Sequence, residues 1–312
     1  MNRRVIQIFC MVVGMVLASS CGDECPVEQP YSVRVSVKDK NYLNISQFPQ
    51  LSPVDENLPF RTYAGTLYYA LYDASTGALI RESAVVSTEG EEKEYTLTFP
   101  GVPDGDYKLA VWGNLTTDYP AGILHQDGKE HADIYVTSGD LHFSPDYQTE
   151  ELTLERTKGK LLLLCSNFPS EITRIEQNVS HVYQSTDAGL NYSGSTQVDK
   201  NVPFTSVLET LLAPTSAEGH SKLTLTFYTG GTRASETPYL KLPVMEMDMR
   251  RNEITAVSID YNTSEGIWEI KMFIVNSTLA VSNIRNRTYT DYEVYLIDYG
   301  YGNFKEKIHF ME

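Results

Sequence analysis

The sequence predicts an all-β protein, built as two tandem β-sandwich domains behind a signal peptide. Many short segments alternate apolar and polar residues with a period of two, and clusters of Gly, Pro, Asn and Asp separate them. No stretch shows a sustained helical period with a cap at each end. The chain has 312 residues, of which 41% are hydrophobic. This length suits two domains of ordinary size, and this composition supplies their cores.

The first sandwich is expected over residues 31–156. Tyr31–Val37 has a valine at every second position from Val33 onward, so one face of this strand is apolar. Pro103–Gly105 predicts a tight turn, since glycine readily adopts a positive φ. The other alternating segments are 67–71, 95–99, 107–111 and 152–154. Together they indicate a half-buried antiparallel sheet, with the domain boundary near Glu155–Lys158.

The second sandwich is expected over residues 157–312 and includes a C-terminal strand segment. Lys160–Cys165 is almost wholly apolar, which is typical of a strand buried on both faces. Residues 172–183 fit either a short helix or a strand. Alternation returns in segments 223–227, 255–261, 268–274 and 294–296. So many short strands favour a β-sandwich over other all-β folds.

The N-terminus predicts an exported lipoprotein. Residues 1–20 begin with a basic pair and continue with the apolar run Val5–Leu17, which is shorter than the roughly 20 residues that a spanning helix needs. Small residues then lead directly to Cys21. We therefore expect cleavage before Cys21 and lipidation of its thiol, with residues 21–30 as a tether. The alternative is ordinary secretion after Ser20, which would leave Cys21 as a plain thiol.

The charge and the cysteines exclude several classes of protein. The formal net charge is −16, and it becomes −18 once the two arginines of the acid-free signal peptide are removed. Such a chain repels nucleic acid. Cys25 and Cys165 are too far apart in sequence to indicate a disulfide framework, although their pairing stays open. Cys165 ends an apolar run and is expected to act as a small core residue.

Few residues suggest chemistry at a site. The tightest group is a polar loop with two histidines and two acids, at His125, Asp127, Glu130 and His131. These residue types can bind a metal, but their spacing matches no ligand motif, so a solvated loop is the favoured interpretation. No phosphate-binding loop, dinucleotide fingerprint or nucleophile elbow occurs. We therefore expect no enzymatic activity, no catalytic residue, no metal and no cofactor.

The two tryptophans could serve as platforms on which a sugar stacks. Trp112 lies on the strand face opposite Tyr107, near the end of its segment. Trp268 shares a face with Ile270 and Ile274, so it is expected to pack in a core.

Several segments resemble the fimbrillin-associated anchor proteins (FimB type) of Bacteroidetes. The most specific is Phe99–Asn114, with the sequence FPGVPDGDYKLAVWGN. The resemblance also includes Tyr69–Asp73, Arg156–Leu161 and Arg251-Asn252, and it extends over roughly residues 30–262. It implies two tandem transthyretin-like Greek-key sandwiches. It further implies a pilus anchor that holds a fimbrillin fibre to the outer membrane and is exposed at the cell surface.

In such fimbriae, a protease removes the first strand of a stalk subunit, and a partner's strand fills the groove by β-augmentation. Cleavage after Arg34 or Arg61 would detach the domain from its lipid, so we expect the first strand, around Val33–Val37, to stay in place. The candidate for a donated strand is the segment Tyr292–Phe310. The alternative is that this segment forms a plain edge strand of the second domain.

Two other functions share most of these features. A surface glycan-binding lipoprotein of a nutrient-uptake system would also be lipidated, acidic and β-rich, but it should show several exposed aromatic residues on one sandwich face. A tip or minor adhesin subunit is the second alternative, and the lipid alone does not distinguish it from an anchor.

Overall fold

The computed structural model describes residues 30–116, 121–146, 149–230, 238–262, 264, 267–274, 279–280, 288–289, 292–298 and 304–310. Strands dominate these residues, and the helical elements among them are three 3-10 turns. The turns are η1 (Ile45–Gln47), η2 (Phe60–Thr62) and η3 (Gln126–Gly128). The all-β prediction is therefore confirmed. No helix in this part of the chain has the length and apolar character needed to cross a membrane.

Eight strands form the first sandwich. They are β1 (Tyr31–Val37), β2 (Thr66–Asp73), β3 (Leu79–Glu82), β4 (Val86–Ser87), β5 (Tyr95–Phe99), β6 (Gly105–Gly113), β7 (Tyr135–Phe143) and β8 (Thr149–Arg156). Their order is β3-β2-β6-β7-β8-β1-β5, and β4 lies beside β2. The link between β7 and β8 has two residue pairs, Tyr135↔Arg156 and Val136↔Glu155. The sheet bends at this short link.

The two arms of the bent sheet face each other across an aromatic core. The ring of Tyr31 on β1 stacks on Phe143 of β7 with centroids 4.6 Å apart. Tyr69 of β2 meets Phe99 of β5 edge to face at 5.3 Å. Such pairs add to the free energy gained by burying the rings. The alternating residues predicted to face inward on β1, β2, β5 and β6 belong to this core.

Among the described residues, the second sandwich consists of a six-stranded and a five-stranded sheet. The first has the order β14-β9-β18-β19-β22-β23, and the second has the order β13-β10-β15-β16 with β17 beside β15. Their strands are β9 (Gly159–Ser166), β10 (Ile172–Val182), β13 (Thr196–Pro203), β14 (Val207–Leu212), β15 (Ser221–Thr229), β16 (Pro238–Lys241), β17 (Met245–Met247), β18 (Ile254–Asn262), β19 (Ile267–Ile274), β22 (Tyr292–Asp298) and β23 (Phe304–Phe310). Two short pairs, β11 (Ser185–Thr186) with β12 (Tyr192–Ser193) and β20 (Leu279–Ala280) with β21 (Thr288–Tyr289), stand apart.

The structure decides between alternatives that the sequence left open. The segment 172–183 is strand β10, because it pairs with β13 on one side and β15 on the other. Most strand pairs in the described part of the chain are antiparallel, as predicted, with two exceptions. The first strand of each sandwich pairs in parallel with a later strand, β1 with β8 and β9 with β18. The domain limits 31–156 and 157–312 and the transthyretin-like Greek-key topology stay predictions.

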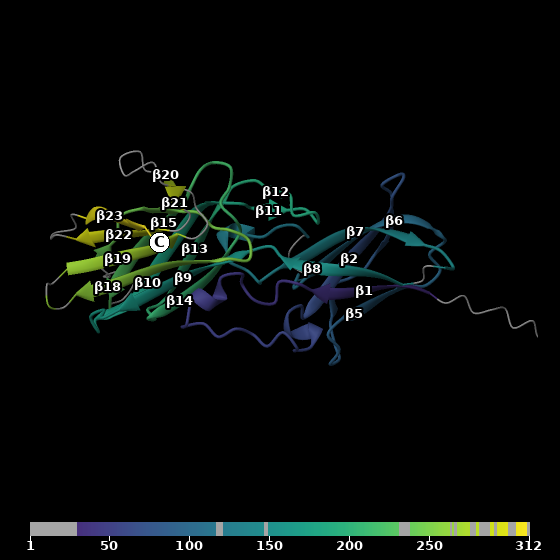
Figure 1. The fold of residues 1–312 in the computed structure, drawn as a ribbon, viewed down its shortest axis with the longest axis horizontal. Helices are drawn as coiled ribbons and strands as arrows, with labels where there is room; N and C mark the ends of the chain where they lie inside the picture. Colours follow the sequence, from purple (N-terminus) through teal and green to yellow (C-terminus); the bar gives the residue numbers. More distant parts are fainter. Residues whose placement is uncertain are drawn as a thin grey trace, which may run out of the picture.

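Strand β9 is buried on both faces, as its apolar sequence predicts. Leu161 and Leu163 point into the core between the two sheets of the second sandwich. Leu162 faces the other way and packs against Tyr42 and Phe48, which come from the β1–β2 connection (residues 38–65). This connection leaves the first sandwich and covers an outer sheet face of the second (Figure 1, dark violet).

The C-terminal segment is part of the second sandwich. Strand β22 pairs with β19, and β23 pairs with β22, both antiparallel. The structure thus shows the alternative considered for Tyr292–Phe310, an edge of the second sandwich's own sheet, formed here by two strands. Within the part of the chain that the structure describes, β23 is the last strand of this sheet.

Candidate functional site at the junction of the two sandwiches

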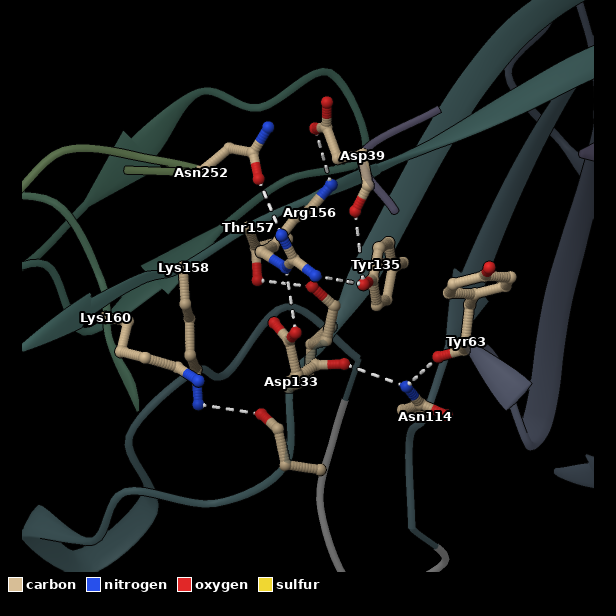
Figure 2. Close-up of polar contacts among 12 residues, drawn as sticks. Asp39, Tyr63, Asn114, Asp133, Tyr135, Arg156, Thr157, Lys158, Lys160 and Asn252 are labelled. Carbon is tan, nitrogen blue, oxygen red and sulfur yellow. Dashed lines mark hydrogen bonds and ion pairs between the residues drawn. The ribbon is translucent and has the colours of Figure 1, made fainter. Parts of the chain in front are cut away.

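Arg156, at the end of β8, is the centre of a polar cluster between the two sandwiches (Figure 2). Its Nε donates to Asp133 Oδ2 at 2.8 Å, its Nη1 to Asn252 Oδ1 at 2.6 Å and its Nη2 to the hydroxyl of Tyr135 at 2.7 Å. The guanidinium also lies 4.2 Å from the ring centre of Tyr42. One buried cation thus connects β7, the loop before it, the β1–β2 connection and the turn before β18.

A second contact of this cluster runs through Asp39. Its Oδ2 accepts hydrogen bonds from the backbone N–H of Arg156 at 3.0 Å and from Arg251 Nη1 at 2.7 Å. Arg251 also pairs with Glu155 at 2.9 Å. Asp39 is buried, so these charge-assisted bonds compensate the loss of hydration of its carboxylate.

Lys158 is fully buried in the link between β8 and β9. Its Nζ donates to the carbonyl oxygens of Glu130 at 2.5 Å and Ala132 at 3.0 Å. Burial lowers the pKa of Lys158 to about 8. The next residue, Gly159, lies against the turn before β18, where an added Cβ would meet the carbonyl oxygen of Arg250 at 2.1 Å. Only glycine allows this close approach.

The polar loop that the sequence offered as a metal site instead covers the edge of β14. His125 is 1% exposed; its Nδ1–H donates to the carbonyl of Lys129, and its Nε2 accepts the N–H of Ala213 at 2.9 Å. Glu130 accepts the N–H of Leu211 at 2.7 Å and pairs with Lys200 at 2.5 Å. These bonds satisfy backbone groups that an edge strand leaves bare.

The protonation state of His125 agrees with this role. Burial lowers the pKa of His125 to about 3, so the ring is neutral near pH 7 and keeps one acceptor nitrogen. Of the other two residues of the predicted group, His131 contacts the carbonyl of Gln126 at 2.8 Å, and Asp127 is exposed. The described residues contain no group of three or more possible metal ligands.

A cleft of about 570 Å³ opens beside this cluster. Its walls include Arg156 and Asp133, together with Lys160 and Glu209, which form an ion pair with each other. Because the opposite charges in the walls already pair with each other, these side chains serve to hold the neighbouring segments together.

The junction also has an apolar part. Trp112 is 5% exposed and packs with Leu124, Ile134, Val136 and Ala213. The hypothesis of Trp112 as an open sugar platform is therefore wrong, because residues from both sandwiches cover the indole. The side chain of Trp268 lies outside the described residues.

Like the two tryptophans, the cysteines are only partly covered by the described residues. Cys21, the predicted lipid carrier, and Cys25 lie outside the described residues. Cys165 is a buried free thiol in the core of the second sandwich, as expected. Burial raises the pKa of Cys165 to about 12, so the thiol stays protonated and unreactive.

Arg156 and Lys158 belong to the segment Arg156–Leu161, which the sequence marks by its family resemblance but not as a polar junction. The sequence does hold a signal for this junction. Arg156 and Lys158 lie at the point where the last strand of the first sandwich ends, just before the apolar strand that begins the second. A cation in such a link must find partners when both neighbouring strands are buried.

Residues 22–147 match a family model described as fimbrillin-A associated anchor proteins Mfa1 and Mfa2. This region is therefore similar to the fimbrillin-A associated anchor proteins. The match includes the specific segment Phe99–Asn114, so the resemblance found in the sequence is confirmed. It is shorter than the resemblance, which was followed to about residue 262, and the second sandwich lies beyond it. No curated protein matches the chain.

The chain also matches solved structures of other bacterial proteins. A candidate adhesin from Bacteroides thetaiotaomicron is 13% identical, with a TM-score of 0.53 over 80% of this chain and 97% of its own. The fimbrial anchor protein Mfa2 from Porphyromonas gingivalis is 12% identical, with a TM-score of 0.44 over 90% of this chain and 100% of its own. At such low identity, the likeness to the adhesin candidate shows the fold alone.

Proposed function

We propose that this protein is a non-enzymatic outer-membrane lipoprotein that acts as a fimbrial anchor or minor subunit and tethers a fibre to the cell surface. The observation that carries the proposal is the anchor-family match over residues 22–147, which include strands β1 to β7. The partner is a fimbrial stalk subunit.

The proposed lipid at Cys21 would hold the first sandwich near the membrane. Residues 21–30 form a tether of ten residues, which spans at most about 35 Å when extended. Two or more acyl chains make such anchoring stable, because each buried methylene contributes about 0.8 kcal/mol. The second sandwich would then stand farther from the membrane, and a pull on it would reach the lipid through the junction.

Strand β1 is suited to carry this load. It lies between β5 and β8 and pairs with both along its length. A pull on the tether acts along β1, so it loads the hydrogen bonds of both ladders in shear. The side chains of Val33 and Val35, which belong to β1, are fully buried in the core. These features support a first strand that stays in place, with Arg34 in its middle uncleaved.

Strand addition to the partner is proposed at β23. An edge strand presents N–H and C=O groups that an extended segment of another subunit can pair with. The opposite edge of the same sheet, β14, is capped by Glu130, and His125 bonds to Ala213 directly after this strand. Strand β23 is therefore the edge of this sheet that we propose for the fibre.

The first experiment is deletion of the gene, with imaging of fibres on the cells and in the medium. Fibres that are shed, overlong or loosely held support an anchor. Unchanged surface fibres contradict the proposal and favour the glycan-binding function.

Two variants separate the parts of the proposal. Cys21→Ser should abolish labelling by a radioactive fatty acid and release the protein from the membrane, whereas Cys25→Ser should keep the label and the membrane attachment.

Deletion of residues 304–312 should leave a folded, lipidated protein that no longer retains fibres. Normal retention by this deletion variant would contradict the role of β23 while leaving the lipid anchor standing.

A further inference from the structure

The outer face of the first sandwich carries a trough that runs across three strands. Ala70 on β2, Ala110 on β6 and Ser138 on β7 are register partners and form its floor. Their small side chains leave a cleft of about 490 Å³. The faces of β2 and β6 around this row carry larger residues, so the depression is built by residue size.

Aromatic residues form the walls of this trough. Tyr68 and its cross-strand partner Trp112 stand on one side of the small row, and Tyr72 stands on the other beside Lys108. Both tyrosines are partly exposed, while Trp112 is nearly buried. The cleft therefore offers flat apolar surfaces that water reaches.

A loop of the second sandwich forms the polar end of the trough. The loop between β11 and β12 (residues 187–191) lines the trough, and Thr186 donates its N–H to the carbonyl of Gly122 at 2.8 Å. Gly122 has a φ of +90°, and a Cβ there would lie 2.7 Å from the carbonyl oxygen of Thr186. Only glycine permits this approach, which holds the loop over the sheet.

Asp187 is fixed in this loop as an ionised acceptor. Its Oδ1 accepts the N–H groups of Gly189 at 2.8 Å and Asn191 at 3.0 Å, and the Asn191 side chain donates to both carboxylate oxygens. Hydrogen bonds from Asn191, with further help from Lys108, hold the pKa of Asp187 below its usual range. The carboxylate thus faces the trough in one orientation and loses little entropy on accepting a ligand hydroxyl.

We propose that this trough binds a neutral pyranose of a carbohydrate chain. One face of such a ring carries C–H groups that pack on the tyrosines, and its hydroxyls donate to Asp187 and accept from Lys108. A cleft between two domains with apolar walls and a few fixed polar groups is a common site for such ligands.

Other ligand classes fit less well. A peptide strand has no free backbone to pair with, because β6 is bonded to β2 on one side and β7 on the other. A nucleotide or another polyanion meets the carboxylate of Asp187 and a chain of net charge −16. The proposal does not depend on the anchor function.

The test applies the purified full-length mature protein to an array of immobilised neutral hexose, N-acetylhexosamine and sialylated chains. Binding to neutral chains should fall about tenfold or more in Tyr72→Ala and in Asp187→Asn, and Tyr72→Phe should retain it. Tyr239→Ala, at an exposed tyrosine on β16, is the matched control and should bind as the wild type. Unchanged melting temperatures will show that each variant folds.

Two results would overturn the assignment. The first is no signal of the wild type above that of the Tyr72→Ala, Asp187→Asn double variant. The second is binding restricted to sialylated chains that Lys108→Ala removes and Asp187→Asn does not.

Discussion

Asn44 and Ile254 lie 210 positions apart in the sequence and share two hydrogen bonds. The Asn44 Nδ2 donates to the carbonyl of Ile254 at 2.9 Å, and the Ile254 N–H donates to Asn44 Oδ1 at 2.8 Å. One amide side chain from the β1–β2 connection thus satisfies both backbone groups of the first residue of β18. Together with the cover that Tyr42 and Phe48 place on β9, this pair fixes the connection to the second sandwich.

Asn44→Ala should lower the free energy of unfolding by about 2–3 kcal/mol, because two buried backbone groups of Ile254 lose their partner. Denaturant unfolding measures this change. Asn57→Ala is the control, since Asn57 is exposed and bonds to Asp55 nearby, and it should change the value by less than 1 kcal/mol. Equal losses in both variants would contradict the role of Asn44.

Arg156→Leu should destabilise the protein by about 3 kcal/mol, because Asp133 loses its cation in a poorly solvated site. The exposed pair of Arg34 with Glu151 provides the control, and Arg34→Leu should cost less than 1 kcal/mol. The double variant Arg156→Leu, Asp133→Leu should recover part of the loss. Failure to recover any stability would show that the charge of Asp133 is not the cause.

Glu130→Ala should expose the edge of β14. The N–H of Leu211 loses its acceptor, so its amide hydrogen exchange should accelerate about tenfold or more, which corresponds to about 1.4 kcal/mol. Lys129→Ala alters an exposed side chain of the same loop and should leave this rate unchanged. Equal protection of Leu211 in Glu130→Ala and the wild type would contradict the edge cap.

The stability should depend on His125 between pH 6.5 and about 3. Burial depresses its folded pKa to about 3 from 6.5, so below pH 6.5 the unfolded chain binds a proton that the folded chain does not. Stability is then lost as the pH falls, on the order of 5 kcal/mol over the whole window. His125→Gln keeps an acceptor for Ala213 but cannot titrate. Its unfolding free energy, measured at pH 7, 5.5 and 4, should fall less steeply than that of the wild type.

Much of the fold was predictable from local patterns. The alternation in Tyr31–Val37 and the apolar run Lys160–Cys165 identify β1 and β9, because a strand must place alternate residues on opposite faces. The segment 172–183 stayed ambiguous, since its pattern fits two periods and its partners β13 and β15 are distant in sequence. Parallel pairing of β1 with β8 leaves no mark in either segment.

The candidate sites were less predictable. The histidines of the polar loop suggested metal chemistry, yet His125 accepts the N–H of Ala213, which directly follows β14 and lies 88 positions away in the sequence. The sequence suggested tryptophans as sugar platforms, whereas the aromatic side chains that are partly exposed in the trough of the first sandwich are Tyr68 and Tyr72. Exposure depends on what packs over a side chain, and sequence does not reveal this.

Most strand segments and the anchor-family resemblance follow from patterns among neighbouring residues, and the acidic charge follows from composition. The buried junction of Arg156 and Lys158, the cap of Glu130 on β14 and the bonds between Asn44 and Ile254 appear only in the folded chain. A buried polar group bonds to whichever partner folding brings within about 3 Å, at any separation in sequence, so local patterns do not reveal these pairs.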